Sequence, residues 1–433
     1  MTEEGQQKIR SLVEMTLSYV VEPKPLSVPV VPETLEALVG QLNSKLSLQQ
    51  QGEGQQQVVQ KEDGQGDEES WDGEAFGVRL AGLGKLLSND VTKATLACKP
   101  PAETKTVIGM VDALGETCFR LAGFIDSIPV KVAGQTYKRE IQTLANDIFL
   151  ATAGLLNEFL DVKVEKLTQI QQQSLVINGP LSGLSNNAGG SSGSSKEAAG
   201  KEDGYLVKAG IVWEACEIFE KASRSNHQAV AKKWGDMMST LEDAIAEVQE
   251  MINSNDDKKD SNDESDDDED GGSGSDSDDS WNDDEKMTEE EKQLSIRANA
   301  LLKLTKLLFK KLQQRCLDVQ PSLTITTTST TETTSTSSLP PITLKPSDLS
   351  RMWDQLYDRA RGIVALADEV ATSLYSPQDQ AAIIELMQEL SRKNHDCILV
   401  GRLFVRGQAE HEKWLDMCEA QSKKILDTVQ QHQ

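Results

Sequence analysis

The sequence predicts an all-α protein made of two antiparallel helical bundle domains. In most of the non-repetitive chain, apolar residues recur every three or four positions, which is the spacing of one helix face. Short breaks with proline or glycine separate many of these stretches, as between antiparallel neighbours in a bundle. No strand-like alternation bounded by turn residues occurs to any extent.

One acidic run, Asp256–Glu285, divides the chain. It holds 16 Asp or Glu residues and two Lys, a net charge of −14 out of −26 for all 433 residues. Like charges repel, and there is almost no apolar area to offset the entropy lost on ordering. We therefore expect a disordered acidic linker. The remaining 403 residues carry only −12, which disfavours general affinity for nucleic acid.

Composition shifts set the expected domain boundaries. Residues 1–70 form an N-terminal extension with short helices, at 3–21 and 32–46, and a linker. The first bundle is predicted over 71–252, with a disordered low-complexity insert at 169–203. The acidic linker spans 253–285. The second bundle follows over 286–433, with a Thr-rich linker at 319–346.

Within the first bundle the periodicity predicts several helices. The stretch after Ala102 has a one-sided stripe: Val107, Val111, Leu114, Cys118, Leu121 and Ile125. The helix before it is expected to use Val78, Leu83, Leu86, Leu87, Val91 and Leu96. Residues 205–221 are apolar on two faces, which predicts a buried helix. Residues 225–252 carry a single stripe: Val230, Trp234, Met237, Leu241, Ile245, Val248 and Ile252.

In the second bundle, Thr288 and Glu291 form a T-x-x-E capping box that starts a helix. Its predicted core face is Leu294, Ala298, Leu301, Thr305, Leu308 and Leu312. The helix from Ser347 shows an unbroken stripe: Leu349, Trp353, Leu356, Ala360, Ile363, Ala367, Val370 and Leu374. Two further helices complete the domain.

Residues suited to catalysis or metal binding are not grouped in the sequence. The six cysteines form no C-x-x-C pair and are interpreted as reduced core thiols of an intracellular protein. The four histidines are isolated from cysteine and from one another, so they are interpreted as surface or interface residues. No nucleotide-binding loop or hydrolase motif is present. We predict no enzymatic activity and no cofactor or metal.

The N-terminus lacks a basic region leading into an apolar block, and no run of about eighteen apolar residues occurs. The sequence therefore disfavours secretion and membrane contact.

Two sets of residues are candidates for binding or modification. Tryptophans are common anchors at protein interfaces, although core packing is the favoured alternative for each of them. The candidate partner-binding residues are Trp213, Trp234, Trp281, Trp353 and Trp414. Five serines have an acidic residue three positions on, a pattern of acid-directed phosphorylation that acidic composition also produces by chance. They are Ser261, Ser265, Ser273, Ser275 and Ser280.

Two short stretches, Lys306-x-Leu308-Phe309 and Arg10-x-Leu12, resemble a cyclin-docking element. Leu308 lies on a predicted core stripe, so helix packing is the favoured interpretation.

Several blocks in chain order resemble the cyclin-D-interacting protein family known as GCIP. They are PAETKTVIGMVDAL (residues 101–114), VWEAC (212–216), SWNDDE (280–285), IRANALLKL (296–304) and ADEVATSLYSPQD (367–379). The resemblance spans roughly residues 71–429. It implies an all-α protein with two helical domains and no known catalysis. This chain differs in its N-terminal extension, Gly/Ser insert and Thr-rich linker.

The resemblance also implies a function. Family members in animals bind D-type cyclins, restrain cyclin-dependent phosphorylation and dimerise with helix-loop-helix transcription regulators without contacting DNA. We therefore expect a non-enzymatic regulator of cell-cycle progression or transcription, with protein partners of these kinds, in cytoplasm and nucleus. The alternative is a helical scaffold or adaptor of the vinculin-like cytoskeletal type. The oligomeric state is left open.

Overall fold

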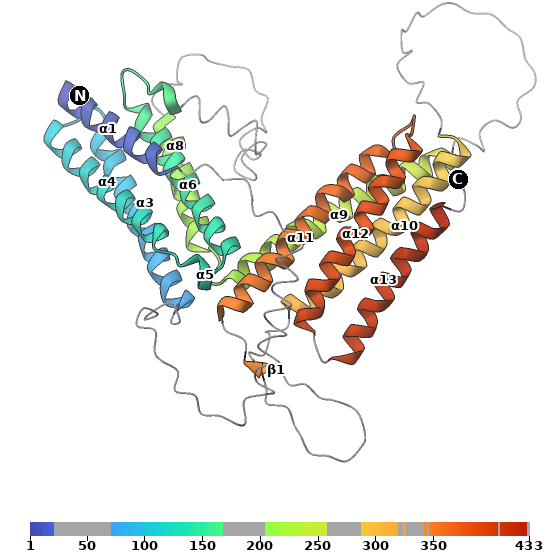
Figure 1. The fold of residues 1–433 in the computed structure, drawn as a ribbon. Helices are drawn as coiled ribbons and strands as arrows, with labels where there is room; N and C mark the ends of the chain where they lie inside the picture. The colour runs from blue at the N-terminus through green and yellow to red at the C-terminus, as the bar shows by residue number, and fades with distance from the viewer. Residues whose placement is uncertain are drawn as a thin grey trace, which may run out of the picture. The chain divides into compact units, whose positions relative to one another are not determined.

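The computed structural model describes residues 1–20, 71–167, 204–257, 287–318, 324–325, 342–343, 346–405 and 408–430. Nearly all of them are helical, so the predicted all-α class is confirmed (Figure 1). The described residues up to Ala229 form one compact unit, and those from Val230 onward form a second. The five candidate serines, Trp281 and the predicted helix at 32–46 lie outside the described residues.

The first unit is a closed arrangement of five long helices (Figure 1). The helices pack in the cyclic order α1, α4, α3, α8, α6, and α4 also contacts α6. The short helix α5, Val130–Ala133, leads into α6. The long helices are α1 (Glu3–Tyr19), α3 (Gly73–Cys98), α4 (Thr104–Asp126), α6 (Gln135–Glu158) and α8 (Gly204–Glu220).

The stripe predicted for α4 is confirmed. All six of its residues, from Val107 to Ile125, are buried in the core of the unit. Three of the cysteines, Cys98, Cys118 and Cys216, lie in the same core, where burial raises the pKa of each thiol to about 12. Such thiols stay protonated at neutral pH and behave as small apolar side chains.

Helix α1 is part of this core, whereas the sequence assigned residues 1–70 to an extension outside the bundle. Ile9 and Val13 are fully buried. At the end of α6, the Gln6 amide donates to the Phe159 carbonyl at 3.0 Å and accepts from the Asp161 N–H at 3.1 Å. An amphipathic stripe at the N-terminus thus supplies one wall of the unit, which chain position alone does not reveal.

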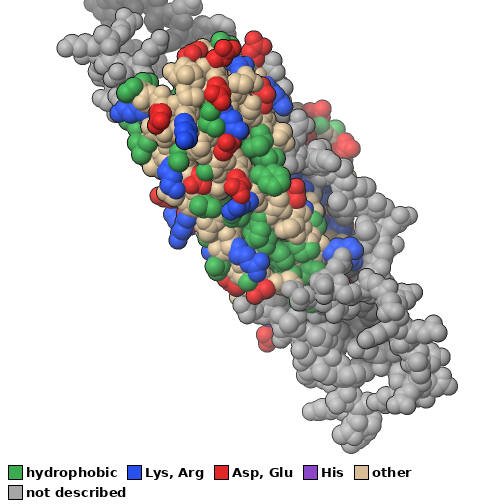
Figure 2. All heavy atoms as spheres, turned by 90° about the vertical axis from the view of Figure 1, so that its left-hand side faces the viewer, with side chains coloured by type: hydrophobic (Ala, Val, Ile, Leu, Met, Phe, Trp, Pro, Cys, Tyr) green, Lys and Arg blue, Asp and Glu red, His purple; other side chains and the backbone are tan. Residues whose placement is uncertain are grey.

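The apolar faces predicted for α3 and α8 are partly wrong. On α3, Val78, Leu86 and Leu96 are exposed, while Phe76 and Leu80 are buried instead. Helix α8 was expected to be buried all round, but in the closed arrangement only one face meets other helices. Its outer face exposes Leu206, Val207, Trp213 and Ile218. Figure 2 shows one face of the molecule, on which hydrophobic side chains lie among Lys, Arg, Asp and Glu side chains.

A tight turn joins α5 to α6 at Gly134. Its φ of +92° lies in the region that favours glycine. A Cβ at this position would overlap the side-chain amide of Asn226. That amide accepts a 2.9 Å hydrogen bond from the backbone N–H of Tyr137 in the first turn of α6. Gly134 therefore makes room for the residue that caps α6.

We predict that Gly134→Ala destabilises the first unit by about 2–3 kcal/mol, since it combines backbone strain with loss of the Asn226 contact. Denaturant unfolding followed by circular dichroism would measure this. Gly109→Ala is the control, because this exposed position on α4 has open space around its Cβ. It should raise stability by about 0.5–1 kcal/mol. Equal stability of Gly134→Ala and the unmodified protein would contradict the assignment.

The second unit contains residues from Val230 of α9 (Asn226–Asp257) together with the later elements. Helix α12 packs against α11 and α13, and α10 contacts α11, α12 and α13. A two-residue antiparallel pair, β1 with β2, lies within the segment predicted as the Thr-rich linker. The elements are α10 (Glu289–Leu312), the π-helical η2 (Gln313–Leu317), β1 (Thr324–Ile325), β2 (Ile342–Thr343), α11 (Pro346–Ser373), α12 (Gln380–Phe404) and α13 (Ala409–Gln430).

The stripe predicted for residues 225–252 is buried throughout, but it faces the core of the second unit. Trp234 packs on Phe309 with ring centroids 4.9 Å apart, and Gln249 accepts from the Asn299 amide at 3.1 Å, so α9 runs antiparallel to α10. The structure therefore divides the chain near residue 229, whereas the sequence placed the domain boundary at 252. The periodicity identified the apolar face without indicating which bundle it joins.

The core stripe of α10 is confirmed, and that of α11 is confirmed except at Trp353. This side chain is half-buried, and Met352 takes the core position beside it. The core position is therefore shifted by one residue from the prediction. This shift corresponds to a rotation of about 100° around the helix axis in the first turns of α11.

The capping box at the start of α10 is also confirmed, and it extends into a tertiary contact. The Thr288 N–H donates to Glu291 Oε2 at 2.7 Å, and the Glu291 N–H donates to Thr288 Oγ1 at 3.2 Å. The other carboxylate oxygen of Glu291 accepts from the backbone N–H of Gln378, between α11 and α12, at 2.9 Å. Hydrogen bonds from these two N–H groups lower the pKa of Glu291.

We predict that Glu291→Gln lowers the stability of the second unit by about 1–2 kcal/mol near pH 7, because one N–H loses a charged acceptor. The folded pKa is depressed, so the stabilisation is present above the unfolded pKa and is lost as pH falls through the folded value. The difference from the unmodified protein should therefore shrink below about pH 4. Glu290→Gln is the control, since it removes the same charge from an exposed position. A difference independent of pH would contradict this role.

Candidate functional site

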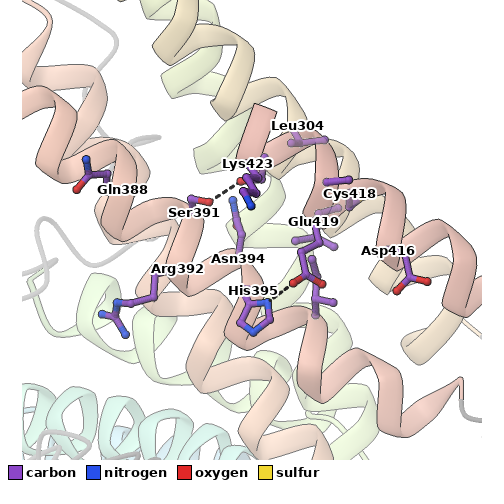
Figure 3. A pocket seen from close by; sticks show the side chains of 14 residues that line it. Leu304, Gln388, Ser391, Arg392, Asn394, His395, Asp416, Cys418, Glu419 and Lys423 are labelled. Atoms are coloured by element: carbon purple, nitrogen blue, oxygen red, sulfur yellow. Dashed lines mark hydrogen bonds and ion pairs between the residues drawn. The ribbon is translucent and has the colours of Figure 1, made fainter. Parts of the chain in front are cut away.

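The second unit contains a groove of about 600 Å³ between α10, α12 and α13 (Figure 3). Ser391 and Asn394 on α12 and Cys418 and Ser422 on α13 are small or short side chains along this seam. They leave space where larger ones would interdigitate. The lining residues are Leu304, Leu308, Gln388, Ser391, Arg392, Asn394, His395, Ile398, Asp416, Cys418, Glu419, Ala420, Ser422 and Lys423.

The deep wall of the groove is apolar. Leu304 and Leu308 lie one turn apart on α10, and Ile398 and Cys418 face the space from α12 and α13. Leu308, Ile398 and Cys418 are buried. An apolar wall between helices is the usual receptor for an amphipathic helix or for large side chains of a partner.

A short polar network crosses the groove. Ser391 and Ser422 are joined by a 2.7 Å hydrogen bond from α12 to α13. The Asn394 amide donates to Thr305 Oγ1 at 2.8 Å, and Thr305 in turn donates to the Leu301 carbonyl at 2.9 Å. The Asn394 side chain is 3% exposed, and its Oδ1 has no hydrogen-bond partner among the described residues. An unsatisfied buried acceptor costs about 1–3 kcal/mol.

Charged residues line the outer edge. His395 Nδ1 lies 3.0 Å from Glu419 Oε1, and Figure 3 shows the two side chains facing each other. Arg402 binds Asp416 at 2.6 Å and Glu419 at 3.2 Å, which fixes α13 to α12. In the part of the chain that the structure describes, no hydrogen bond joins His395 to a serine.

A smaller cavity of about 140 Å³ lies where η2 meets the start of α13. Trp414, Lys311, Arg315 and His411 line it, and Arg315 Nη1 lies 2.7 Å from His411 Nε2. Burial lowers the pKa of His411, and the charges of Arg315 and Lys311 lower it further. A neutral imidazole accepts the hydrogen bond from the guanidinium. The cations also sit at the C-terminal end of α10, where the helix dipole favours them.

The candidate tryptophans occupy different environments. Trp234 is fully buried and donates to the Phe309 carbonyl, so its role is in the core. Trp353 is half-buried, and Trp414 lines the small cavity. Trp213 is 37% exposed on the first unit. None of these four lines the larger groove.

The two cyclin-docking-like stretches are core elements. Leu308 and Phe309 are buried, as is Leu12. Lys306 forms an ion pair with Glu242 at 3.0 Å. The preference for helix packing over docking is confirmed.

Among the described residues, no group of three or more His, Cys, Asp or Glu side chains is arranged to hold a metal ion. The same residues include no helix with the length and apolar character needed to cross a membrane.

Two family models match successive parts of the chain. Residues 79–254 match the model described as "Grap2 and cyclin-D-interacting, N-terminal", and residues 255–398 match its C-terminal counterpart. The two matches together span well over half of the sequence. The chain belongs to the Grap2 and cyclin-D-interacting family.

The chain also shows a distant similarity to a named protein. A Xenopus laevis protein named "Cyclin-D1-binding protein 1 homolog" is 24% identical over 189 residues, which is 43% of this chain and 46% of that protein. The match therefore spans less than half of the relative's length.

The blocks that resemble the Grap2 and cyclin-D-interacting family can now be located in the structure. The block at residues 367–379 ends α11 and begins the turn to α12, where Gln378 meets Glu291 and the Tyr375 hydroxyl donates to Glu247 at 2.6 Å. In the block at 212–216, Val212 and Cys216 are buried while Trp213 is exposed. Of the residues in these blocks only Leu304 lines the larger groove, together with Leu308 of the cyclin-docking-like stretch.

We predict that Asn394→Leu stabilises the second unit by about 1 kcal/mol, since an apolar side chain of similar size replaces an amide whose Oδ1 is buried without a partner in the described part of the chain. Scanning calorimetry would show a higher melting temperature for the second unit. Asn394→Ala is the control and should lower stability, because it leaves a cavity. A loss of stability in Asn394→Leu would show instead that the amide is needed for packing.

Proposed function

We propose that this chain is a non-enzymatic protein-binding regulator and that the groove between α10, α12 and α13 binds a partner. Family membership supports a binding function, because the family description names an interaction with cyclin D. The groove supplies an apolar wall with charged edges in one rigid seam. The groove is the observation that carries the proposal.

The first partner to test is a D-type cyclin. The name of the Xenopus relative points to the same class. By the resemblance, the consequence of binding is restraint of cyclin-dependent phosphorylation, in cytoplasm and nucleus. Helix-loop-helix transcription regulators are the second class of partner. Phosphorylation of the five serines stays a prediction.

A helical scaffold of the cytoskeletal type is the alternative, because bundles of long amphipathic helices also serve as adaptors. Affinity purification from the native organism separates the two functions. Recovery of cyclins or transcription regulators supports the proposal. Recovery of actin-associated proteins without either class supports the scaffold.

We predict that Ala420→Trp weakens binding of a recombinant D-type cyclin at least tenfold, because an indole at this position fills the groove. Ala420 is exposed on α13, so the change should leave the core intact. Isothermal titration with the full chain would measure the dissociation constants. Gln421→Trp is the matched control, since the neighbouring side chain is also exposed but does not line the groove.

Equal weakening by both substitutions would contradict the groove as the binding site. No cyclin binding by the unmodified protein would contradict the partner.

A further inference from the structure

The outer face of α8 exposes four large apolar side chains, and Glu214 and Glu217 lie on the same face. Leu206 is 50% exposed, Val207 64%, Trp213 37% and Ile218 38%. The opposite face of this helix already packs in the core through residues such as Val212 and Phe219. Scattered exposed apolar residues are normal, whereas neighbouring ones that form a patch mark an interaction site.

The neighbouring helix extends this face. Trp213 contacts Thr92, and Glu220 pairs with Lys85, so α3 and α8 run antiparallel in a fixed register. The register places Leu96, itself 68% exposed, beside residues 209 and 210, between Leu206 and Trp213. A Cβ at Gly210 would meet nothing within 4 Å, so the backbone is open there. We call Leu96, Leu206, Gly210 and Trp213 the α3–α8 surface.

Trp213 is held in place on this surface. Its indole N–H donates to Thr92 Oγ1 at 3.1 Å, and the Thr92 hydroxyl donates to the Ser88 carbonyl at 2.8 Å. The ring is therefore oriented before a partner arrives, which reduces the entropy lost on binding. Ordered aromatic side chains of this kind are frequent anchors in interfaces.

On α8 itself carboxylates outnumber cations, with Glu214, Glu217 and Glu220 against Lys208. Glu214 and Glu217 are exposed on α8, and neither forms an ion pair among the described residues. The adjacent cation of α3, Lys85, is paired with Glu220 at 3.8 Å. A partner with Lys or Arg beside its apolar residues would meet these carboxylates favourably. A second copy of this chain would bring the same acids together, which disfavours self-association through this face.

We propose that the α3–α8 surface binds an amphipathic helix of a protein partner whose apolar stripe is flanked by Lys or Arg. Leucine-sized side chains spaced along one helix face fit beside Trp213 and Leu96, and the open backbone at Gly210 allows close approach. This site lies in the first unit and does not depend on the groove or on the proposed cyclin partner.

The test uses the full chain and two labelled synthetic peptides of about 20 residues, long enough to form a helix. Both carry the same leucine stripe, one flanked by Lys and the other by Glu. Fluorescence anisotropy should show the Lys-flanked peptide binding at least tenfold more tightly. Trp213→Ala should weaken its binding at least tenfold, whereas Phe119→Ala should not, because Phe119 is an exposed aromatic on α4 outside the surface.

The double variant Glu214→Lys with Glu217→Lys is a second test, which can be used if Trp213→Ala fails to fold. This double reversal changes only exposed positions and should weaken the Lys-flanked peptide at least fivefold at low salt, with the loss reduced at high salt. Equal binding of both peptides overturns the proposal, as does an equal effect of Trp213→Ala and Phe119→Ala. So does no peptide binding at all, or a dimer in sedimentation that Trp213→Ala abolishes.

Discussion

Burial of one apolar stripe per helix is the interaction on which both units depend. In α4 and α10 this stripe is continuous from the first turn to the last. Even the polar atoms it contains are neutral. Buried thiols such as Cys118 and Cys397 have pKa values raised to about 12. The Thr305 hydroxyl donates a hydrogen bond to the backbone carbonyl one turn earlier in α10. Burying a charged or polar group costs free energy unless it is hydrogen-bonded, and several of the contacts that such groups make lie at helix ends.

Those contacts at helix ends set how the helices meet. Apolar stripes slide past one another at little cost, whereas a hydrogen bond to a particular backbone N–H has one geometry. Asn226 fixes the start of α6, Gln6 fixes α1 at the end of α6, and Glu291 fixes the start of α10 to the α11–α12 connection. The block at residues 367–379 that resembles the family includes the partner of Glu291, Gln378. This contact gives the block a structural role at the start of α10.

The sequence predicted the all-α class and the faces of α4, α9 and α10, because helical periodicity is a local property. It could not predict which unit α9 joins, since Trp234 would be equally buried in either. The exposed positions Val78 and Leu96 on α3 were misassigned for a related reason: which apolar face is covered depends on neighbours distant in the chain. The sequence could not predict the groove, because the groove arises where several short side chains meet. Ser391, Asn394 and Ser422 look unremarkable in sequence, and only the packing of α12 against α13 turns them into a lining.

The two candidate surfaces arise from opposite departures from close packing. The groove in the second unit has too little side-chain volume along the seam of α12 and α13, and it leaves the buried Asn394 acceptor unsatisfied. Helix α8 in the first unit has more apolar surface than the closed arrangement can cover. Each departure costs free energy in the isolated chain, through lost dispersion contacts in one case and apolar hydration in the other. A partner that fills the groove or covers the α3–α8 surface removes that cost. The free energy regained in this way contributes to binding.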